Sequence, residues 1–348
     1  MNFRPDAIDQ DWPRLARHLE AHGHRLGLDA PPRQFSSGFA NLNYRLDVDG
    51  APCVLRRPPP GPLPPGAHDM VREHRVLSQL WRAFPLAPRA FHLCEDLAVL
   101  GAPFFLMEYR PGVAIGPELP PMLAGRPDQA ARIAADLVEV LADLHRVEPA
   151  AVGLDTLGRP HGFLARQVAG WAKRAHLAFD GRPGRTVQRI VGWLGDHIEP
   201  ERAVALVHND FKLDNVLLDP DRFTPVAVVD WDMCTRGCPL YDLAILLSYW
   251  TEPDDHPAMH QLRQMPSAAP GFPSRAEVLD AYARRSGIDI GNFRFYRVLS
   301  VFRLAIVFRQ LVNLYRRGAR TSPEFAGFGD VAAGLLDFAA AIIDGQRD

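Results

Sequence analysis

Lysine is almost absent from this chain. Of its 39 lysine and arginine residues only Lys173 and Lys212 are lysine, and the formal net charge is −2. A balanced charge excludes the strongly basic composition of proteins that bind nucleic acid or anionic membrane surfaces. Arginine's planar fork and lysine's compact ammonium are not interchangeable beside a phosphate. In a chain that otherwise uses arginine, Lys212 is therefore a candidate functional residue.

Features of exported and membrane-spanning chains are also missing. No apolar run reaches the roughly 18 residues that a membrane helix needs. Residues 1–6 lack the basic-then-apolar pattern of a signal peptide. The spacing of the four cysteines completes no zinc site, so reduced thiols are expected: Cys53, Cys94, Cys234 and Cys238. The sequence predicts a cytoplasmic protein with no membrane or nucleic-acid partner.

Length and patterning predict two lobes. The 348 residues suffice for about two domains of ~150 residues each. We expect an α+β chain with a small β-rich lobe over residues 1–109, a hinge at Pro111-Gly112, and a larger helical lobe over 110–348. In the small lobe, helices are expected at 7–27 and 71–84, and strands at 44–48, 52–56, 91–100 and 103–109. In the large lobe, helices are expected at 130–145, 163–178, 185–199, 240–250, 275–285, 292–317 and 326–343, around a hairpin of 216–218 and 226–229.

Two short motifs carry the chemistry. Residues 208–215 read His-Asn-Asp-Phe-Lys-Leu-Asp-Asn, and residues 228–232 read Val-Val-Asp-Trp-Asp. Apolar runs at 203–207 and 226–229 lead into them as strands. The spacing is typical of a phosphoryl-transfer loop, with a base aspartate, a lysine two residues on, and an asparagine five residues on. A second metal-binding aspartate follows across the hairpin.

These roles fall on particular residues. Asp210 is the predicted base that accepts the acceptor hydroxyl's proton, and Lys212 would neutralise charge on the moving phosphoryl group. Asn215 and Asp230 offer hard oxygen ligands suited to Mg²⁺. His208 is expected to brace the loop. An aspartate after a strand is often only a turn or cap residue, but the joint pattern favours a kinase.

The small lobe should supply a phosphate-anchoring cation and an acidic partner on a helix. Arg56, at the end of a strand, and Glu73, early in the next helix, are the candidates, although each could be an ordinary surface residue. The small-residue turn at 36–41 is the candidate phosphate loop, with Ser37, Gly38 and Asn41. It has one glycine and could equally be a simple hairpin turn.

The chain leaves no room for a long activation segment. Residues 237–244, Gly-Cys-Pro-Leu-Tyr-Asp-Leu-Ala, follow the second motif closely. Asp242 opens a helix there, where its carboxylate could cap the helix or brace the catalytic loop; we take it as structural. The short gap favours a small-molecule kinase over a protein kinase that is switched by phosphorylation.

These residues together resemble the aminoglycoside phosphotransferase and choline kinase family. The resemblance rests on Asn41, Arg56, Glu73, the 208–215 motif, Asp230 and residues 237–242. Segments 54–61, 72–75, 93–96 and 105–109 are similar to one branch, the kinase-like proteins and domains associated with acyl-CoA dehydrogenases. The resemblance covers roughly residues 30–340.

The resemblance implies a bilobal, protein-kinase-like fold that binds ATP between its lobes. It makes Arg56 the counterpart of the usual phosphate-anchoring lysine and places the adenine against the backbone of Met107, Glu108 and Tyr109. The branch is thought to phosphorylate the hydroxyl of 4-hydroxyacyl-CoA thioesters, which implies a CoA thioester as substrate and an acyl-CoA dehydrogenase as functional partner. One departure is that residues 37–40, Ser-Gly-Phe-Ala, lack the paired glycines of the branch, which puts this loop's phosphate contacts in question.

The acceptor stays open at this point. Between Asp289 and Glu324 there are seven arginines and no acidic residue, and five of them (294, 297, 309, 316 and 320) fall within an arc of roughly 140° on an ideal helix. We predict that Arg309 and Arg316 contact CoA phosphates, whereas a solvated helix face is the plain alternative. An aminoglycoside, choline-like or sugar kinase and a nucleotide-binding regulatory pseudokinase are the competing functions.

Overall fold

The computed structural model describes residues 3–36, 41–61, 68–318 and 323–345. By their contacts the residues form two compact units. The first comprises residues 1–114, 149–155 and 215–234, and the second comprises 115–148, 156–214 and 235–348. The hairpin predicted for the helical lobe thus groups with the first unit, and the chain passes from the second unit to the first between Asp214 and Asn215.

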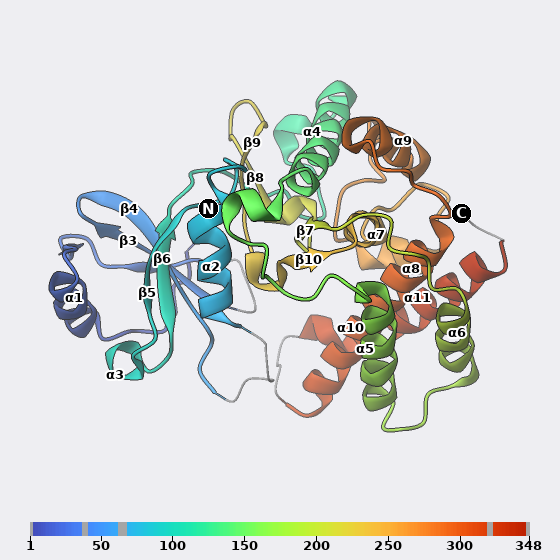
Figure 1. Ribbon diagram of the computed structural model, residues 1–348, viewed down its shortest axis with the longest axis horizontal. Coiled ribbons are helices and arrows are strands. Elements are labelled where there is room, and N and C mark those ends of the chain that lie inside the picture. Colours follow the sequence, from blue (N-terminus) through green and yellow to red (C-terminus); the bar gives the residue numbers. More distant parts are fainter. Residues whose placement is uncertain (1–2, 37–40, 62–67, 319–322, 346–348) are drawn as a thin grey trace. The chain divides into compact units, whose positions relative to one another are not determined.

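The first unit is built on a six-stranded antiparallel sheet with the order β1-β3-β4-β6-β5, in which β2 also pairs with β3 (Figure 1). Its strands are β1 (Leu26–Gly27), β2 (Arg33–Gln34), β3 (Leu42–Val48), β4 (Ala51–Arg57), β5 (Ala90–Cys94) and β6 (Phe104–Glu108). Its helices are α1 (Trp12–Ala21), α2 (Met70–Leu80) and α3 (Leu97–Leu100). A separate hairpin joins β8 (Val216–Leu218) to β9 (Pro225–Val228).

Both faces of the large sheet are covered. Leu15 and Leu19 of α1 pack with the alternate residues Leu42, Tyr44 and Leu46 of β3. Helix α2 packs on β5 and β6, and its His74 ring meets the ring of Phe105. Because neighbouring residues of a strand point to opposite faces, Arg56 and Arg57 of β4 serve different sides of the sheet.

Several predicted elements of the first unit differ in length. The leading helix begins only after its N-cap Asp11 and ends before Gly23, whose φ is 82°. The strand expected at 91–100 stops at Cys94, because Asp96 caps a short helix that ends at Gly101 with φ 78°. Between the strands expected at 44–48 and 52–56 the chain turns at Asp49 and Gly50, both at positive φ.

The second unit is mainly helical. It contains α4 (Pro127–His145), α5 (Phe163–Ala178), α6 (Arg185–Asp196), α7 (Pro239–Ser248), α8 (Pro257–Leu262), α9 (Arg275–Ser286), α10 (Arg294–Arg316) and α11 (Phe328–Ile343). A two-stranded sheet pairs β7 (Ala205–Val207) with β10 (Thr235–Gly237). Helix α8 was not predicted from the sequence. The other helices lie within a few residues of their predicted bounds.

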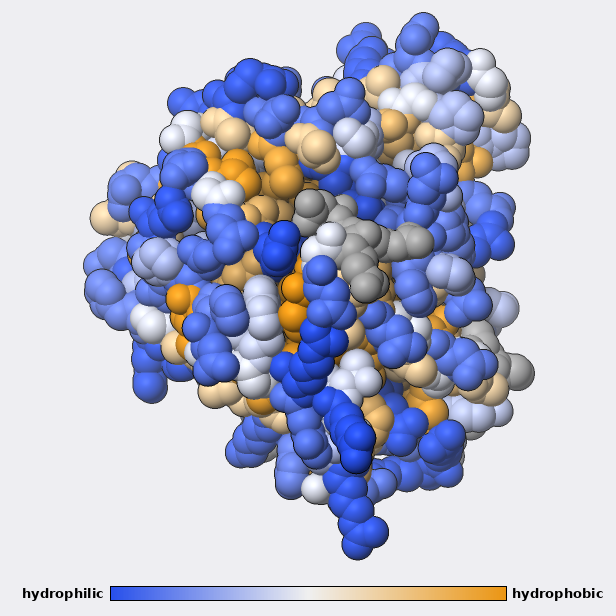
Figure 2. All heavy atoms as spheres, turned by 90° about the vertical axis from the view of Figure 1, so that its right-hand side faces the viewer, coloured by the Kyte–Doolittle hydropathy of each residue, from blue (hydrophilic) through white to orange (hydrophobic). Residues whose placement is uncertain are grey.

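Helix α10 is the centre of the second unit, where it packs against α11, α7 and α5. The segments Arg294–Arg316 and Phe325–Ile343 are long and apolar enough to cross a membrane by length and composition alone, and 61% and 39% of their apolar windows are buried in the protein. Such helices are weak evidence for a membrane span, because core helices have the same composition. On the face shown in Figure 2, hydrophilic residues predominate and hydrophobic residues form small, separate groups.

Candidate active site

The first unit holds an ion triad in which two of the three members are buried. Arg56 Nε donates to Glu73 Oε2 at 2.8 Å, and Arg56 Nη2 donates to Asp230 Oδ1. Arg56 and Glu73 are both buried. The structure therefore brings together the predicted phosphate-anchoring cation, its helical partner and one predicted metal ligand. Residue 230 is far from residues 56 and 73 in the sequence, so this contact is a result of the fold.

The triad fixes a positive charge. Burial alone would lower the pKa of Arg56, but the nearby negative charges of Glu73, Asp230 and Asp232 outweigh it and raise that pKa. Burial raises the pKa of Glu73 to about 7, with Asp230 and Asp232 adding to the shift and Arg56 opposing it. A guanidinium that stays ionised suits the anchoring of phosphates.

The loop that carries Asp230 is held in a strained conformation. Asp230 has φ 68°, in the left-handed region, which costs a non-glycine residue ~1–3 kcal/mol. Helix α2 holds the loop in place, since the Trp231 amide donates to Glu73 Oε1 at 3.2 Å and Arg72 donates to the carbonyl of Asp232. On the other strand of the hairpin, the Asn215 carbonyl accepts the Val229 amide at 2.9 Å.

The oxygen donors of this loop suit a hard cation. Asn215 offers an amide oxygen and Asp230 a carboxylate. Mg²⁺ is commonly held by one or two such groups together with substrate phosphates and water. Among the described residues, no group of three His, Cys, Asp or Glu side chains is arranged to hold a metal. The donor set therefore fits Mg²⁺ brought in with a nucleotide better than a metal bound by protein alone.

The second unit holds the predicted base. Arg303 Nη2 lies 3.5 Å from Asp210 Oδ1, and the Tyr249 hydroxyl lies 3.4 Å from the same oxygen. Lys212 Nζ lies 3.5 Å from Asp210 Oδ2 and 3.4 Å from Asp214 Oδ2. These distances are long for hydrogen bonds, so the contacts are mainly electrostatic. Two cations thus flank the carboxylate predicted to accept a proton.

A buried network supports the loop beneath Asp210. Asp242 Oδ2 accepts the His208 amide at 2.6 Å and pairs with His145 Nε2 at 3.1 Å, while Oδ1 accepts the Asn209 amide at 2.7 Å. His145 Nδ1 pairs in turn with the Tyr282 hydroxyl at 2.6 Å. Burial would raise the pKa of Asp242, but the hydrogen bond from His145, the charges of His145 and His208, and the His208 amide together lower it.

This network decides between two readings of Asp242. The N-cap of α7 is Cys238, and both Asp242 oxygens accept from the catalytic loop or from His145, so Asp242 braces the loop. His208 Nδ1 accepts the Asp210 amide at 3.3 Å, as a bracing role requires. Asn209 between them has φ 62°, so both motif loops contain a residue in the left-handed region.

The structure describes only some of the residues predicted to contact the adenine and the phosphates. Ser37 and Gly38 lie outside the described residues. Asn41 is buried; its Oδ1 pairs with His68 Nδ1 at 2.8 Å, and its Nδ2 has no hydrogen-bond partner in the described chain. Of the predicted adenine-binding backbone, Met107–Tyr109, the Glu108 amide already donates to the Arg89 carbonyl at 2.9 Å.

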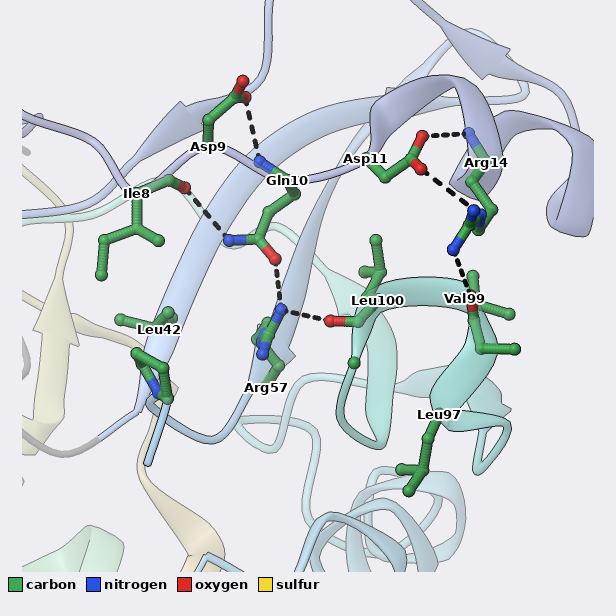
Figure 3. A pocket seen from close by; sticks show the side chains of 13 residues that line it. Ile8, Asp9, Gln10, Asp11, Arg14, Leu42, Arg57, Leu97, Val99 and Leu100 are labelled. Carbon is green, nitrogen blue, oxygen red and sulfur yellow. Dashed lines mark hydrogen bonds and ion pairs between the residues drawn. The ribbon is translucent and has the colours of Figure 1, made fainter. Parts of the chain in front are cut away.

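A pocket of about 420 Å³ lies in the first unit, on the face of the sheet opposite Arg56 (Figure 3). Arg57 donates through Nη1 to Gln10 Oε1 and, at 2.7 Å, to the Leu100 carbonyl. The pocket therefore lies apart from the predicted nucleotide contacts, and its polar groups pair with one another.

The predicted basic stripe does not form one surface. Arg297 is buried, with its guanidinium 5.4 Å from the centre of the Phe338 ring. Arg309 lies 4.8 Å from the centre of the Phe179 ring, and its Nε donates to the Ala178 carbonyl at 3.3 Å. Arg316 is exposed. Arg320 lies outside the described residues.

Sequence reasoning missed several residues around Asp210. Arg303 was counted in the acid-free segment but excluded from the stripe, because it lies on the opposite side of the helix. His145 follows Leu141 by four residues and so lies on the apolar stripe of α4. A titratable side chain on that stripe could have marked His145 as a buried polar residue. No pattern in the sequence distinguishes Tyr249 or Tyr282 from ordinary core tyrosines.

The first unit combines an antiparallel sheet with a strand arginine that pairs with a helix glutamate, and the second unit is helical and carries the loop of Asp210. These features together define a small-molecule phosphotransferase built like a protein kinase. A model of the phosphotransferase enzyme family matches residues 32–296. The chain belongs to that family.

Curated relatives carry acyl-CoA dehydrogenase names. The chain is 31% identical over 308 residues to mouse acyl-CoA dehydrogenase family member 10, and 33% identical over 308 residues to chicken acyl-CoA dehydrogenase family member 11. These alignments cover 88% and 84% of the chain, but only 28% and 38% of the relatives. The chain thus spans well under half of the relatives it matches.

Solved structures agree on the fold. A Ralstonia eutropha protein, named as a candidate aminoglycoside phosphotransferase, superposes with a TM-score of 0.77 at 27% identity, covering 95% of this chain and 99% of its own. Choline kinase from Cryptosporidium parvum matches with a TM-score of 0.57 at 13% identity over 90% of this chain and 89% of its own. The predicted bilobal, kinase-like α+β fold is confirmed.

Proposed function

We propose that this phosphotransferase uses Mg²⁺ and ATP to phosphorylate the hydroxyl of a 4-hydroxyacyl-CoA. The observation that carries the proposal is the setting of Asp210, a carboxylate between Lys212 and Arg303 on a loop that a buried aspartate braces. Phosphoryl transfer depends on positioning and charge more than on covalent help from the protein. A rigid base between two cations meets that need.

Each residue has a defined task in this proposal. Asp210 orients the acceptor hydroxyl and takes its proton. Lys212 offsets negative charge on the transferred group. Arg56, held by Glu73, contacts the nucleotide phosphates. Asn215 and Asp230 would hold Mg²⁺, which on binding supplies charge neutralisation at the phosphates.

The choice of acceptor rests on the relatives. Proteins named as acyl-CoA dehydrogenase family members match most of this chain through part of their own length. A kinase and a dehydrogenase acting on one CoA thioester would explain that combination. We therefore propose a CoA thioester as substrate, an acyl-CoA dehydrogenase as functional partner and the cytoplasm as location.

The test is an ADP-release assay over four acceptor classes: 4-hydroxyacyl-CoAs, free hydroxy acids, aminoglycosides and choline. We expect turnover with the CoA thioesters. Replacing Asp210 by Asn should lower kcat by ~10²–10⁴, the usual contribution of a positioned base, while nucleotide binding survives. Asp221→Asn, in the exposed hairpin turn, is the matched control and should leave kcat unchanged. Nucleotide binding without turnover of any acceptor by the wild type would instead indicate a regulatory pseudokinase.

The arginine contacts need a separate test. Charge reversal of Arg309 and Arg316 should raise KM for the CoA thioester but not for ATP if these residues meet CoA phosphates. Arg284→Glu, also exposed on a helix, is the control. An unchanged ratio of the two KM values would remove Arg309 and Arg316 from the substrate site and leave Arg309 its structural contacts with Ala178 and Phe179.

A further inference from the structure

Three buried polar groups at and around Arg303 have no hydrogen-bond partner in the described part of the chain. They are Trp171 Nε1, the Tyr241 hydroxyl and Arg303 Nη1. The three residues are 7%, 1% and 5% exposed. An unpaired buried polar group costs ~1–3 kcal/mol, so three together are unusual and call for an explanation.

The three groups form one cluster, with one residue from each of α5, α7 and α10 (Figure 1). The Arg303 guanidinium lies 5.7 Å from the centre of the Trp171 ring. The Trp171 indole also approaches the Tyr241 hydroxyl, but without hydrogen-bond geometry. The cluster therefore combines one cation with two neutral polar groups.

Arg303 links this cluster to the base. Its Nη2 donates to the Asn209 carbonyl at 3.1 Å and lies 3.5 Å from Asp210 Oδ1. Its Nη1 is the unpaired atom. The guanidinium, 5.7 Å from the centre of the Trp171 ring, thus faces the base with one nitrogen and leaves the other unpaired, and the Tyr249 hydroxyl also lies near it.

The chemistry of the cluster selects its ligand. An indole N–H and a guanidinium can only donate hydrogen bonds, and a tyrosine hydroxyl can donate one. Donors of this kind are satisfied by an oxygen acceptor, and the positive charge of Arg303 favours one with negative character. A quaternary ammonium or a protonated amine has no acceptor atom and would leave the indole N–H and the guanidinium unpaired.

We propose that Trp171, Tyr241 and Arg303 form a subsite that binds a carbonyl or carboxylate oxygen of the acceptor molecule. The inference rests on the proposed role of Asp210 as base and deepens it. In a 4-hydroxyacyl thioester the oxygen is the thioester carbonyl, three carbons from the hydroxyl that Asp210 deprotonates. The three atoms are covered in the structure, so a side-chain rotation, a common response to binding, admits the oxygen.

The experiment compares Tyr241→Phe with Tyr296→Phe. Tyr296 is also buried, and its hydroxyl also has no partner with hydrogen-bond geometry, but the groups near it are Cys238, Glu199 and Arg202. Both variants lose one unpaired hydroxyl and keep the ring. For Tyr241→Phe we expect KM for the acceptor to rise roughly tenfold, the loss of one hydrogen bond, with KM for ATP unchanged. Tyr296→Phe should change neither constant.

Thermal unfolding without substrate supplies a second readout. Removing a hydroxyl that no protein group pairs should leave the melting temperature of Tyr241→Phe equal to or above that of the wild type. A lower melting temperature with an unchanged acceptor KM would mean that a bound water satisfies the cluster, and would overturn the proposal. Trp171→Phe, which removes the indole N–H, should repeat the acceptor effect.

The outcomes separate this inference from the proposed function. If the wild type prefers choline, which has neither a carbonyl nor a carboxylate, both ideas fail. If it prefers another acceptor with such an oxygen, only the CoA assignment fails, and the ratio of the Tyr241 and Tyr296 variants still tests the subsite. If no acceptor turns over, the thermal shift caused by 4-hydroxypentanoyl-CoA decides: equal shifts in wild type and Tyr241→Phe overturn the subsite, and a smaller shift in the variant supports it.

Discussion

Asp242→Asn is the sharpest test of how the catalytic loop is held. The carboxylate is fully buried and accepts from His208, Asn209 and His145. Asparagine keeps the shape but has one acceptor oxygen, so its NH₂ group must face at least one of these donors. The variant therefore loses the charge and turns one favourable contact into a repulsive one.

The magnitude follows from these contacts. Hydrogen bonds to a charged group contribute ~1.5–3 kcal/mol each, and breaking a buried charge pair typically costs ~3–5 kcal/mol. We expect Asp242→Asn to lower the free energy of unfolding by about 3–5 kcal/mol, a large share of the ~5–15 kcal/mol of an ordinary domain. In the folded fraction, we expect displacement of the loop by about 1 Å to lower kcat by ~10²-fold.

Urea unfolding and ADP release measure the two effects, with Asp143→Asn as the matched control. Asp143 forms an exposed ion pair with Arg285, and such pairs contribute at most ~1 kcal/mol. If Asp242→Asn destabilised the protein no more than Asp143→Asn does, the bracing role would be wrong. Because burial is outweighed by the hydrogen bond from His145 and the nearby charges, which lower the pKa of Asp242 below its ordinary value in the folded state, its contribution is present at neutral pH and lost only on strong acidification.

Three further predictions concern the first unit. The free energy of unfolding should fall by up to about 3 kcal/mol as pH rises from about 4.5 to about 7, because the pKa of Glu73 is raised to about 7 in the folded state. The Glu73→Gln variant should lack this pH dependence. The same pH dependence in the wild type and the variant would exclude Glu73 as its source. Arg56→Lys should raise KM for ATP about tenfold or more, since an ammonium cannot reproduce the fork; an unchanged KM would exclude a phosphate contact. Gly112→Ala places a Cβ 2.9 Å from two side chains of the β8–β9 hairpin and should cost ~1–3 kcal/mol in urea unfolding, whereas Gly116→Ala, with open space around it, should cost much less.

The residues of the two motifs could be predicted because each motif is a short, continuous stretch of sequence. Arg56 and Glu73 could be proposed as partners because one ends a strand and the other begins the next helix, whereas Asp242 was left between a helix cap and a brace for the catalytic loop. The acid-base network beyond them could not be predicted in the same way. His145, Asp242 and Tyr282 are far apart in sequence, and their contact depends on how helices α4, α7 and α9 pack.

Helix α10 shows a second limit of sequence reasoning. Its segment was predicted, and so was its excess of arginine, but an ideal helical wheel cannot tell which side faces the core. The wheel grouped Arg297 with Arg309 and Arg316, whereas packing buries Arg297 against α11 and turns Arg303, on the other side, toward the base. Helix rotation is set by the neighbours, which are absent from the helix's own sequence.

The scarcity of lysine acquires a physical meaning at Asp210. Lys212 is a point charge that reaches two carboxylates from one atom. Arg303 has two separate terminal nitrogens, of which one faces the base and the other has no hydrogen-bond partner in the described chain. A lysine at position 303 could not supply two separate donor atoms, because its three N–H donors share a single nitrogen. Under the proposed roles, the site needs one cation of each kind: a compact one beside the transferred group, and a forked one that contacts both the base and an oxygen of the acceptor.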